Sequence, residues 1–572
     1  MAVRVIFADP RVSIVEESRE IWVVSGVDTG PLRAAIEEGR SVADVIVSVC
    51  DRAEDAALVH VDVGPGGVRS VDAYRSVVSN CELYYGRTDD GTLFLTDQYR
   101  NAVAQVPASE RTLADTAATD HLLFRAPIEP TTYLEEIRAV EHGVWVRWES
   151  ETARPSTTRV DRLTGDVDVE DPVSTLEDVL GDVVRRGTRD REVTTMLSGG
   201  VDSTLLHTYV GDDAAATVLE PDAPELEFEV EYADEAANLL GADPRRVPLS
   251  EDDYLEQLEA SVVRMGFPSH YGLTPVVDAA FAADPGEYYV NGEGSDALFG
   301  LTGIKEFRTA MRCEPLLESP AGSLAGVVPG AVGSRARTLS RQVEQSRRPP
   351  WRPKSFAQQF AFFTAPELAA SFVGADRVAA RAKRQFEYVD ELVGRVPTGR
   401  FERQLQAAHF LSFYRHNTVN QWRQLAYAHG KSLFAPFKTR SVASFALGVP
   451  ADRRYASYRA VPQQTTIKHL PKRVLNRRLP AYDTEKPKGS GAYPRGRFFE
   501  EGCLGGVFER YDPPAFVPEE MYPSHVESYG SLTWNLITFA VWGDRVLEND
   551  ALTTLPESTV VRCDTGVSVE VT

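Results

Sequence analysis

Residues 191–210, REVTTMLSGGVDSTLLHTYV, constrain the fold more than any other stretch of the sequence. A β-branched run, VTTML, leads into Ser198-Gly199-Gly200, and the residues after the glycines have helical spacing. Strand and helix patterns then alternate: strand AAATVL, helix EYADEAANLLG ending at Gly241, strand RVPLS, helices DDYLEQLEASVVRM and TPVVDAAFAA, and strand EYYVN. This alternation predicts an α/β unit with a parallel sheet covered by helices on both faces.

The two glycines and the acidic residue after them predict a site for a pyrophosphate and its metal ion. Ligands of open parallel sheets lie at the carboxyl ends of strands and at helix N-termini. Glycines let the backbone approach an anion closely, and the helix offers free N–H groups. Asp202 would repel a bare phosphate, which indicates a divalent cation between them. Neither the P-loop pattern nor the dinucleotide fingerprint is present.

Two further stretches carry residues suited to chemistry. Residues 288–300, YYVNGEGSDALFG, again end an expected strand in a glycine-rich loop, with Glu293 and Asp296 three positions apart. Near the C-terminus, Lys486 and Lys488 form KPKG in a chain where only nine of the 61 basic residues are lysine. A lysine is therefore a rarer choice here than usual.

These stretches together resemble a known family. SGGVDS resembles the PP-loop signature of ATP pyrophosphatases, and with the GEGSDALFG loop the chain resembles the asparagine synthetase superfamily. Residues 231–249, 423–450 and 479–494 extend the similarity to roughly residues 170–500. The resemblance implies a PP-loop, adenine nucleotide α-hydrolase-like sheet. It also implies an enzyme that adenylates a carboxylate with ATP and lets an amine expel AMP, as in asparagine biosynthesis.

The same resemblance implies roles for individual residues. The residues implied to bind ATP and its pyrophosphate are Leu197, Ser198, Gly199, Gly200, Asp202, Ser203, Gly292 and, beside the adenine at the end of the next strand, Val218. Asp202 and Asp296 would hold Mg²⁺ from two loops. Glu293 is the candidate base for the attacking amine. Lys488 would stabilise the charge that builds up on the α-phosphate.

Three departures from the family pattern fall beside these residues. Ala297 stands where the family has Glu, Leu301 replaces a Gly, and Lys438-Thr439 replace Leu-Asp. These changes leave the nucleotide-binding residues intact. They leave the identity of the carboxylate and of the amine open.

Residues 1–168 carry short β-like runs, including VRVIFAD, ALVHVDVG and VWVRWES, which predict a mainly β domain. ELYYGRTDDGTLFLTDQYRNAVAQ and LEEIRAVEHGVWVRW resemble the closing half of a class II amidotransferase domain of the NTN-hydrolase type. The nucleophile of that domain is an N-terminal Cys, whereas Ala2 and Val3 stand here and the nearest Cys is Cys50, at an expected buried strand end. The expectation is a degenerate glutaminase-like domain.

The expected division of the chain is 1–168 for this domain, 169–548 for the synthetase-like domain and 549–572 for an appended C-terminal tail. Residues 318–354, rich in Gly, Pro and Arg, are expected to be a loop or a poorly ordered insertion, and residues 401–429 a long helical region.

The composition of the chain argues against some classes of binding partner. The net charge of −23 disfavours nucleic acid and anionic membranes, and no apolar run approaches the roughly 18–20 residues of a membrane helix. Two explanations of the acidic bias stay open: a salt-adapted cytosol or an acidic interaction surface. The five scattered cysteines indicate neither zinc nor a disulfide framework. The expectation is a cytoplasmic protein, a possible homodimer, acting on a small-molecule or peptide carboxylate and an amine donor.

The sequence is compatible with three functions. The first is an AMP-forming amide ligase acting on aspartate or on a related or peptide carboxylate without its own glutaminase. The second is intramolecular amide formation of the β-lactam synthetase or lasso-peptide cyclase type, although Gly-Glu-Gly at 292–294 favours the asparagine synthetase acid over the tyrosine of β-lactam synthetases. The third is an inactive nucleotide-binding scaffold, which the four retained residues Asp202, Glu293, Asp296 and Lys488 argue against.

Overall fold

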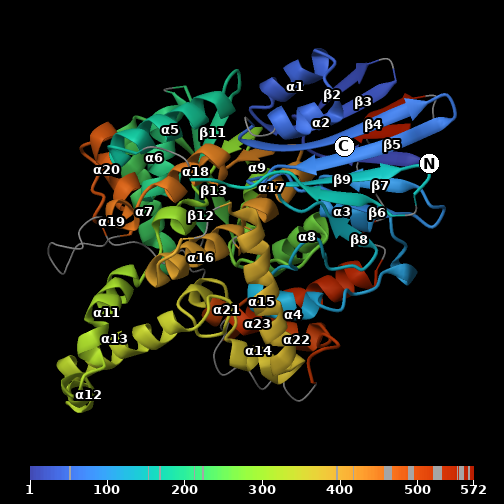
Figure 1. Ribbon diagram of the computed structural model, residues 1–572. Helices are drawn as coiled ribbons and strands as arrows, with labels where there is room; N and C mark the ends of the chain where they lie inside the picture. Colours follow the sequence, from blue (N-terminus) through green and yellow to red (C-terminus); the bar gives the residue numbers. More distant parts are fainter. Residues whose placement is uncertain are drawn as a thin grey trace.

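A computed structural model describes the chain except for residues 18, 50–52, 153, 166–168, 212, 222–223, 395–396, 416–417, 456–466, 487–494, 501, 519–530, 550–551, 553–558, 564–566 and 572. Its strands form two six-stranded sheets and one five-stranded parallel sheet (Figure 1). In these described residues, no helix is long and apolar enough to cross a membrane.

The two six-stranded sheets make the N-terminal β unit. The first contains, in spatial order, β16 (Thr559–Cys563), β17 (Val567–Val571), β1 (Val3–Phe7), β7 (Leu93–Thr96), β6 (Tyr84–Arg87) and β8 (Ile137–Ala139). The second contains β10 (Ser156–Arg159), β9 (Val144–Glu149), β5 (Gly67–Arg75), β4 (Asp55–Gly64), β3 (Glu20–Val27) and β2 (Ser13–Glu17). Alternate residues of β1 and β4, such as Val5 and Val59, share one core because successive strand side chains point to opposite faces.

The last strands of the chain belong to this unit. Val567–Val571 pair with Val3–Phe7 in parallel register, and Val569 is fully buried in the shared core. The segment expected to be a separate tail is therefore part of the N-terminal sheet. The alternation of apolar and polar residues in VSVEV gives it one buried face.

The parallel sheet has the order β13 (Pro244–Leu249), β12 (Ala215–Pro221), β11 (Val193–Met196), β14 (Tyr288–Val290) and β15 (Ser432–Phe434). The chain enters at the central strand β11, moves outward to β13, and returns to β14 on the other side of β11. Tyr288 and Val290 of β14 pack in one core and Tyr289 in another, so both faces are covered. The predicted α/β fold with a mainly β N-terminal domain is confirmed.

Helices complete both units. Those of the N-terminal unit are α1 (Gly30–Glu37), α2 (Val42–Asp44), α3 (Tyr99–Val103) and α4 (Ala117–Phe124). Those near the parallel sheet are α5 (Pro172–Gly187), α6 (Val201–Val210), α7 (Glu227–Leu240), α8 (Tyr254–Met265), α9 (Thr274–Ala283), α10 (Ser295–Phe299), α16 (Arg400–Arg415), α17 (Thr418–Ala428), α18 (Arg440–Gly448), α19 (Ala451–Arg454) and α20 (His469–Arg478). The others are α11 (Ile304–Leu317), α12 (Pro320–Val327), α13 (Ala331–Arg347), α14 (Pro366–Val373), α15 (Ala375–Leu392), α21 (Arg495–Glu500), α22 (Val507–Arg510) and α23 (Ser531–Trp542).

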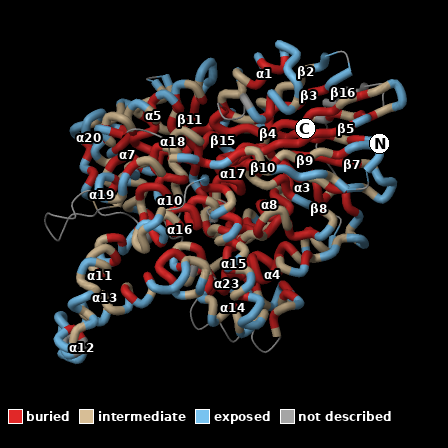
Figure 2. The backbone as a smooth tube through the Cα atoms, in the orientation of Figure 1, coloured by how far each residue is buried: buried red, intermediate tan, exposed pale blue. Residues whose placement is uncertain are grey.

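Two local expectations are wrong. Residues 318–354 contain the helices α12 and α13, which project with α11 from the body of the molecule (Figure 1) and are largely exposed at the tip (Figure 2). The helices form despite the glycines because α13 packs against α11 and α12. Val45–Val49 form a π-helical turn instead of a strand end, and Cys50 lies outside the described residues.

The two units are joined through buried polar contacts. Arg423 of α17 donates to Asp55 of β4 at 3.0 Å. The Gln424 side chain bonds the backbone just after β7, where it donates to the Asp97 carbonyl and accepts from the Tyr99 N–H. Buried segments run continuously from one unit to the other (Figure 2). The N-terminal unit therefore forms one wall of the space above the parallel sheet.

Candidate active site

The two glycine-rich loops meet at the switch point of the parallel sheet. Residues 197–200 follow β11, and residues 291–294 follow β14, which is hydrogen-bonded to β11 in parallel. Strand order reverses between these two strands, since the chain leaves β11 toward β12 and returns at β14. A crevice outside the carboxyl ends of such strands is where open α/β sheets bind ligands.

The first loop is shaped by its glycines. Gly199 has φ +64°, and a Cβ there would lie 2.1 Å from the Tyr232 carbonyl, so only glycine fits. Gly200 is the N-cap residue of α6, whose first turn contains Asp202. Ser203 fixes the loop because its hydroxyl accepts from the Ser198 backbone N–H at 3.2 Å and lies 3.1 Å from Ser198 Oγ. The N-terminus of α6 thus faces the crevice with an ordered loop.

The second loop touches the first. A Cβ on Gly292 would lie 2.9 Å from Cβ of Asp202, so glycine allows the two loops to approach. The Glu293 N–H donates to Asn291 Oδ1 at 2.6 Å, which holds the turn after β14. The structure therefore brings Asp202, Glu293 and Asp296 together, as expected.

A lysine that belongs to none of the sequence motifs lies between these carboxylates. Lys468 Nζ is paired with Asp202 and lies 3.0 Å from Asp296 Oδ1, and only 7% of its side chain is exposed. Burial alone would lower its pKa, but the two carboxylates outweigh burial and raise it. Lys468 therefore stays an ammonium. The scarcity of lysine was the signal that could have identified it.

Glu293 is poised to exchange a proton. Burial raises its pKa to about 7, and Asp296 and Asp202 add to the shift while Lys468 and Lys438 oppose it. A carboxyl that titrates near neutral pH is suited to general acid–base chemistry. Perturbed pKa values of this kind gather at functional sites.

The donors fit a magnesium ion held together with phosphate. Oδ1 of Asp202 is buried and has no hydrogen-bond partner among the described residues, although Oδ2 has one. Mg²⁺ is commonly bound by one or two carboxylates plus substrate phosphates and water. Across the described chain no group of three or more His, Cys, Asp or Glu side chains is arranged to hold a metal unaided. Asp202 and Asp296 are the residues that would hold such an ion together with phosphate.

The lysine expected to act on the α-phosphate, Lys488, lies outside the described residues. Its neighbour Lys486 is held by Glu235 at 3.2 Å, and its ammonium lies 4.5 Å from the ring centre of Tyr232 and 4.3 Å from that of Tyr482. The Tyr482 hydroxyl also donates to the Gly199 carbonyl. The segment that leads to Lys488 therefore packs against the first glycine-rich loop.

Two residues expected at the nucleotide sit deeper in the sheet. Leu197 is 2% exposed, and its N–H donates to the Thr217 carbonyl at 2.9 Å. Val218 is 1% exposed within β12, which continues to Pro221. Val218 therefore does not end its strand as the sequence suggested. Its place beside the adenine stays a prediction.

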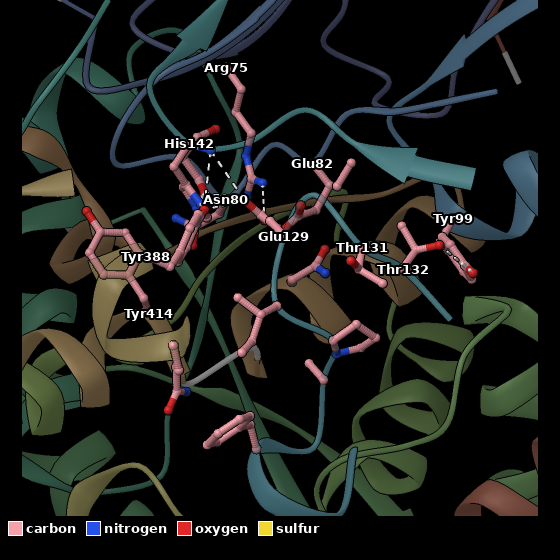
Figure 3. A pocket seen from close by; sticks show the side chains of 18 of the residues that line it. Arg75, Asn80, Glu82, Tyr99, Glu129, Thr131, Thr132, His142, Tyr388 and Tyr414 are labelled. Atoms are coloured by element: carbon pink, nitrogen blue, oxygen red, sulfur yellow. Dashed lines mark hydrogen bonds and ion pairs between the residues drawn. The ribbon is translucent and has the colours of Figure 1, made fainter. Parts of the chain in front are cut away.

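Two cavities adjoin the crevice. The first, of about 150 Å³, is lined by Phe124, Arg125, His270, Tyr271, Glu293, Gly294, Asp296, Ala297, Phe363 and Thr418. The second, of about 130 Å³, lies between the two units, and Phe124 and His270 line both. Figure 3 shows the interdomain cavity, with Arg75, His142 and Glu129 grouped on one side and Tyr99 on the other.

A parallel sheet with two glycine-rich loops and acidic side chains at its switch point belongs to the class of nucleotide-using α/β proteins. The sequence model of the asparagine synthase family matches residues 175–510, more than half of the 572 residues. The chain belongs to the asparagine synthase family, and this membership supports ATP-dependent amide ligation of the asparagine synthetase type. No curated protein matches the chain.

Proposed function

We propose that the protein is an AMP- and pyrophosphate-forming ligase that adenylates a carboxylate and joins it to an amine, without a glutaminase of its own. One observation carries the proposal. Asp202, Glu293 and Asp296 converge with Lys468 at the switch point, beside a glycine-rich loop at the N-terminus of α6.

In the first half-reaction a carboxylate oxygen attacks the α-phosphorus of ATP, and pyrophosphate leaves. The Ser198–Ser203 loop receives the departing phosphates with backbone N–H groups. Asp202 and Asp296 are the residues that would hold Mg²⁺, which neutralises charge on the phosphates when bound. Lys488 is proposed to stabilise the α-phosphate from the segment that follows Lys486.

In the second half-reaction an amine attacks the acyl carbon, a C–N bond forms, and the C–O bond to AMP breaks. The attacking nitrogen must lose a proton, and Glu293 is the proposed acceptor. Its pKa of about 7 lets it take a proton from an amine and release it again near neutral pH.

The amine is proposed to come from solution or from the substrate instead of from glutamine. Hydrolysis of glutamine by a thiol requires an accessible thiolate. Cys81, in the N-terminal unit, is 1% exposed, and burial raises its pKa to about 12. This thiol is therefore unsuited to the task. Intramolecular ligation, in which one substrate supplies both groups, remains a second candidate.

The test is ATP–pyrophosphate exchange measured against a panel of carboxylates, including aspartate and peptides. Carboxylate-dependent exchange and AMP formation on adding an amine are the expected results. Nucleotide binding without exchange for any carboxylate would instead support the inactive scaffold. Release of glutamate from glutamine above background would refute the absence of a glutaminase.

A further inference from the structure

The cavity of about 150 Å³ beside Glu293 is separate from the pyrophosphate loop. None of residues 197–203 is among its described lining residues, whereas Glu293, Gly294 and Asp296 are. A single buried water needs only about 10–15 Å³ of such volume. The cavity is thus large enough for a small organic molecule, and it adjoins the group proposed to accept the proton of the amine.

Its lining contains one strongly basic side chain among the described residues, Arg125. The imidazole of His270, also in the lining, is uncharged near neutral pH because burial, with help from His121 and Arg125, depresses its pKa strongly. Glu293 and Asp296 supply negative charge from the synthetase loop. The cavity therefore has a cationic contribution from the N-terminal unit and an anionic one from the C-terminal unit.

The position of Arg125 is fixed by its surroundings. It follows α4, every residue of which is buried, and its backbone N–H donates to the His121 carbonyl at 2.9 Å with φ +65°. Its guanidinium carbon lies 3.8 Å from the centre of the Phe363 ring. The Phe363 N–H in turn donates to the Leu123 carbonyl at 2.8 Å. Only 5% of Arg125 is exposed, so its side chain is held in place before any ligand arrives.

We propose that Arg125 anchors a carboxylate of the substrate in this cavity, so that the N-terminal unit supplies a specificity residue to the ligase site. The planar guanidinium presents a fork of N–H groups that matches a carboxylate in a bidentate manner. The inference rests on the proposed ligase function. The ligand is a small molecule with a carboxylate for Arg125 and a second reacting group that reaches Glu293.

Two sources of the carboxylate are compatible with this geometry. It is either a second carboxylate on the acyl substrate or the carboxylate of an amino acid that serves as the amine. ATP–pyrophosphate exchange depends on the acyl substrate alone, whereas amide formation depends on both substrates. The two assays therefore distinguish the sources.

The test compares the wild type with Arg125→Met, which keeps an unbranched side chain on Phe363, and Arg125→Lys, which keeps the charge without the fork. The probes are aspartate against its α-amide, and glycine against glycinamide. In Arg125→Met we expect the KM for the carboxylate-bearing probe to rise about 10–100-fold with a small change in kcat, and the preference over the amide to disappear. For Arg125→Lys we expect a KM for the carboxylate-bearing probe between that of the wild type and that of Arg125→Met. The exposed Arg87→Met, in the same unit, is the matched control and should behave as the wild type.

A raised KM in exchange assigns the carboxylate to the acyl substrate; a raised KM in amide formation alone assigns it to the amine. Unchanged KM values in both assays, or a carboxylate preference that survives in Arg125→Met, would overturn the inference. Calorimetric binding of the same probes needs no turnover. Loss of discrimination in Arg125→Met supports the anchor even if exchange, and with it the ligase function, fails. If the wild type binds none of the carboxylate probes, the inference that Arg125 anchors a carboxylate is rejected.

Discussion

Charged side chains gather in the interdomain cavity and in the crevice above the parallel sheet, and in each cluster more than one carboxylate surrounds a buried cation. In the interdomain cavity Arg75 bonds Glu129 at 2.6 Å and Glu82 at 2.8 Å (Figure 3). His142 Nδ1 lies 3.0 Å from Glu129, and the Tyr388 hydroxyl donates to the same carboxylate. In the crevice Lys468 faces Asp202 and Asp296, with Glu293 nearby.

Each cluster also has a carboxyl whose pKa is raised to about 7. Burial is the main cause for Glu82, as it is for Glu293. The two clusters differ in how far their side chains are exposed to solvent. The Arg75 side chain is 0% exposed and that of Glu82 9%, whereas 53% of the Asp296 side chain is exposed. In the buried cluster the negative charge is balanced by side chains of the protein, whereas the exposed carboxylate of the crevice can also face a bound cation and phosphates. Similar charge balance therefore supports stability in one place and chemistry in the other.

The largest effect that separates the two clusters is expected from Asp202→Asn and Asp296→Asn. Each change should reduce pyrophosphate release by about 1000-fold or more, because each removes a proposed Mg²⁺ ligand. The fold should stay intact, but the unfolding midpoint should fall, because each change removes a carboxylate that is paired with the buried ammonium of Lys468. Steady-state pyrophosphate release and thermal unfolding are the measurements. The exposed Asp452→Asn is the control, and near-normal turnover in either crevice variant would make the metal assignment wrong.

The next effect concerns the lysines at 486 and 488. Lys488→Ala should lower turnover about 100–1000-fold with nearly normal ATP binding, as expected for loss of one charge that acts in the transition state. Lys486→Ala should lose far less, because the structure commits Lys486 to Glu235 and to two tyrosine rings. Measuring the turnover and the ATP affinity of both variants tests which lysine acts on the α-phosphate. A larger loss in Lys486→Ala would reverse the assignment.

Arg75→Met should affect stability instead of catalysis. Removing Arg75 leaves Glu82 and Glu129 buried without their cation, which typically costs about 3–5 kcal/mol. Denaturant unfolding should show this loss, while kcat at a temperature where both proteins are folded should change little. Adding Glu129→Gln to Arg75→Met should recover part of the stability. A large fall in kcat with unchanged stability would mean that the interdomain cluster takes part in the reaction.

The sequence predicts the local parts of the site well. The helix expected at VDSTLLHTYV is α6, Val201–Val210, and the two glycine-rich loops follow β11 and β14 as expected. Each of these features depends on neighbours within a few positions, such as glycine where φ is positive at Gly199. Hydrophobic period and turn residues report such local structure directly.

The parts that escaped prediction depend on distant partners. Lys468 donates a hydrogen bond to Asp202, 266 positions away in the sequence, and no local sequence pattern predicts that pairing. Arg125 reaches the site from the other unit, and Val567–Val571 return to pair with Val3–Phe7 across the whole length of the chain. In α12 and α13 the glycines suggested a loop, but packing of α11 against α13 favours helices there. Tertiary contacts override composition in these cases.

The smallest expected effect, a shift of stability with pH, tests the state of Glu293 itself. Its folded-state pKa of about 7 lies above the ordinary value of a glutamate, so the folded protein holds this proton more tightly than the unfolded chain does. The resulting stabilisation is present below the unfolded pKa and is lost as the pH rises through about 7. Glu293→Gln, which stays neutral, should therefore raise the unfolding temperature by roughly 2 °C at pH 8 and by less at pH 5.

The same variant should lose the rise of kcat/KM that the wild type shows as the pH increases through about 7, because the ionised carboxylate is the proposed base. Calorimetric scans and rate profiles at matched pH provide both readings, with the exposed Glu256→Gln as control. An unfolding-temperature difference that is the same at both pH values would show that Glu293 is already ionised in the mildly acidic range and that the crevice does not hold it as a neutral acid.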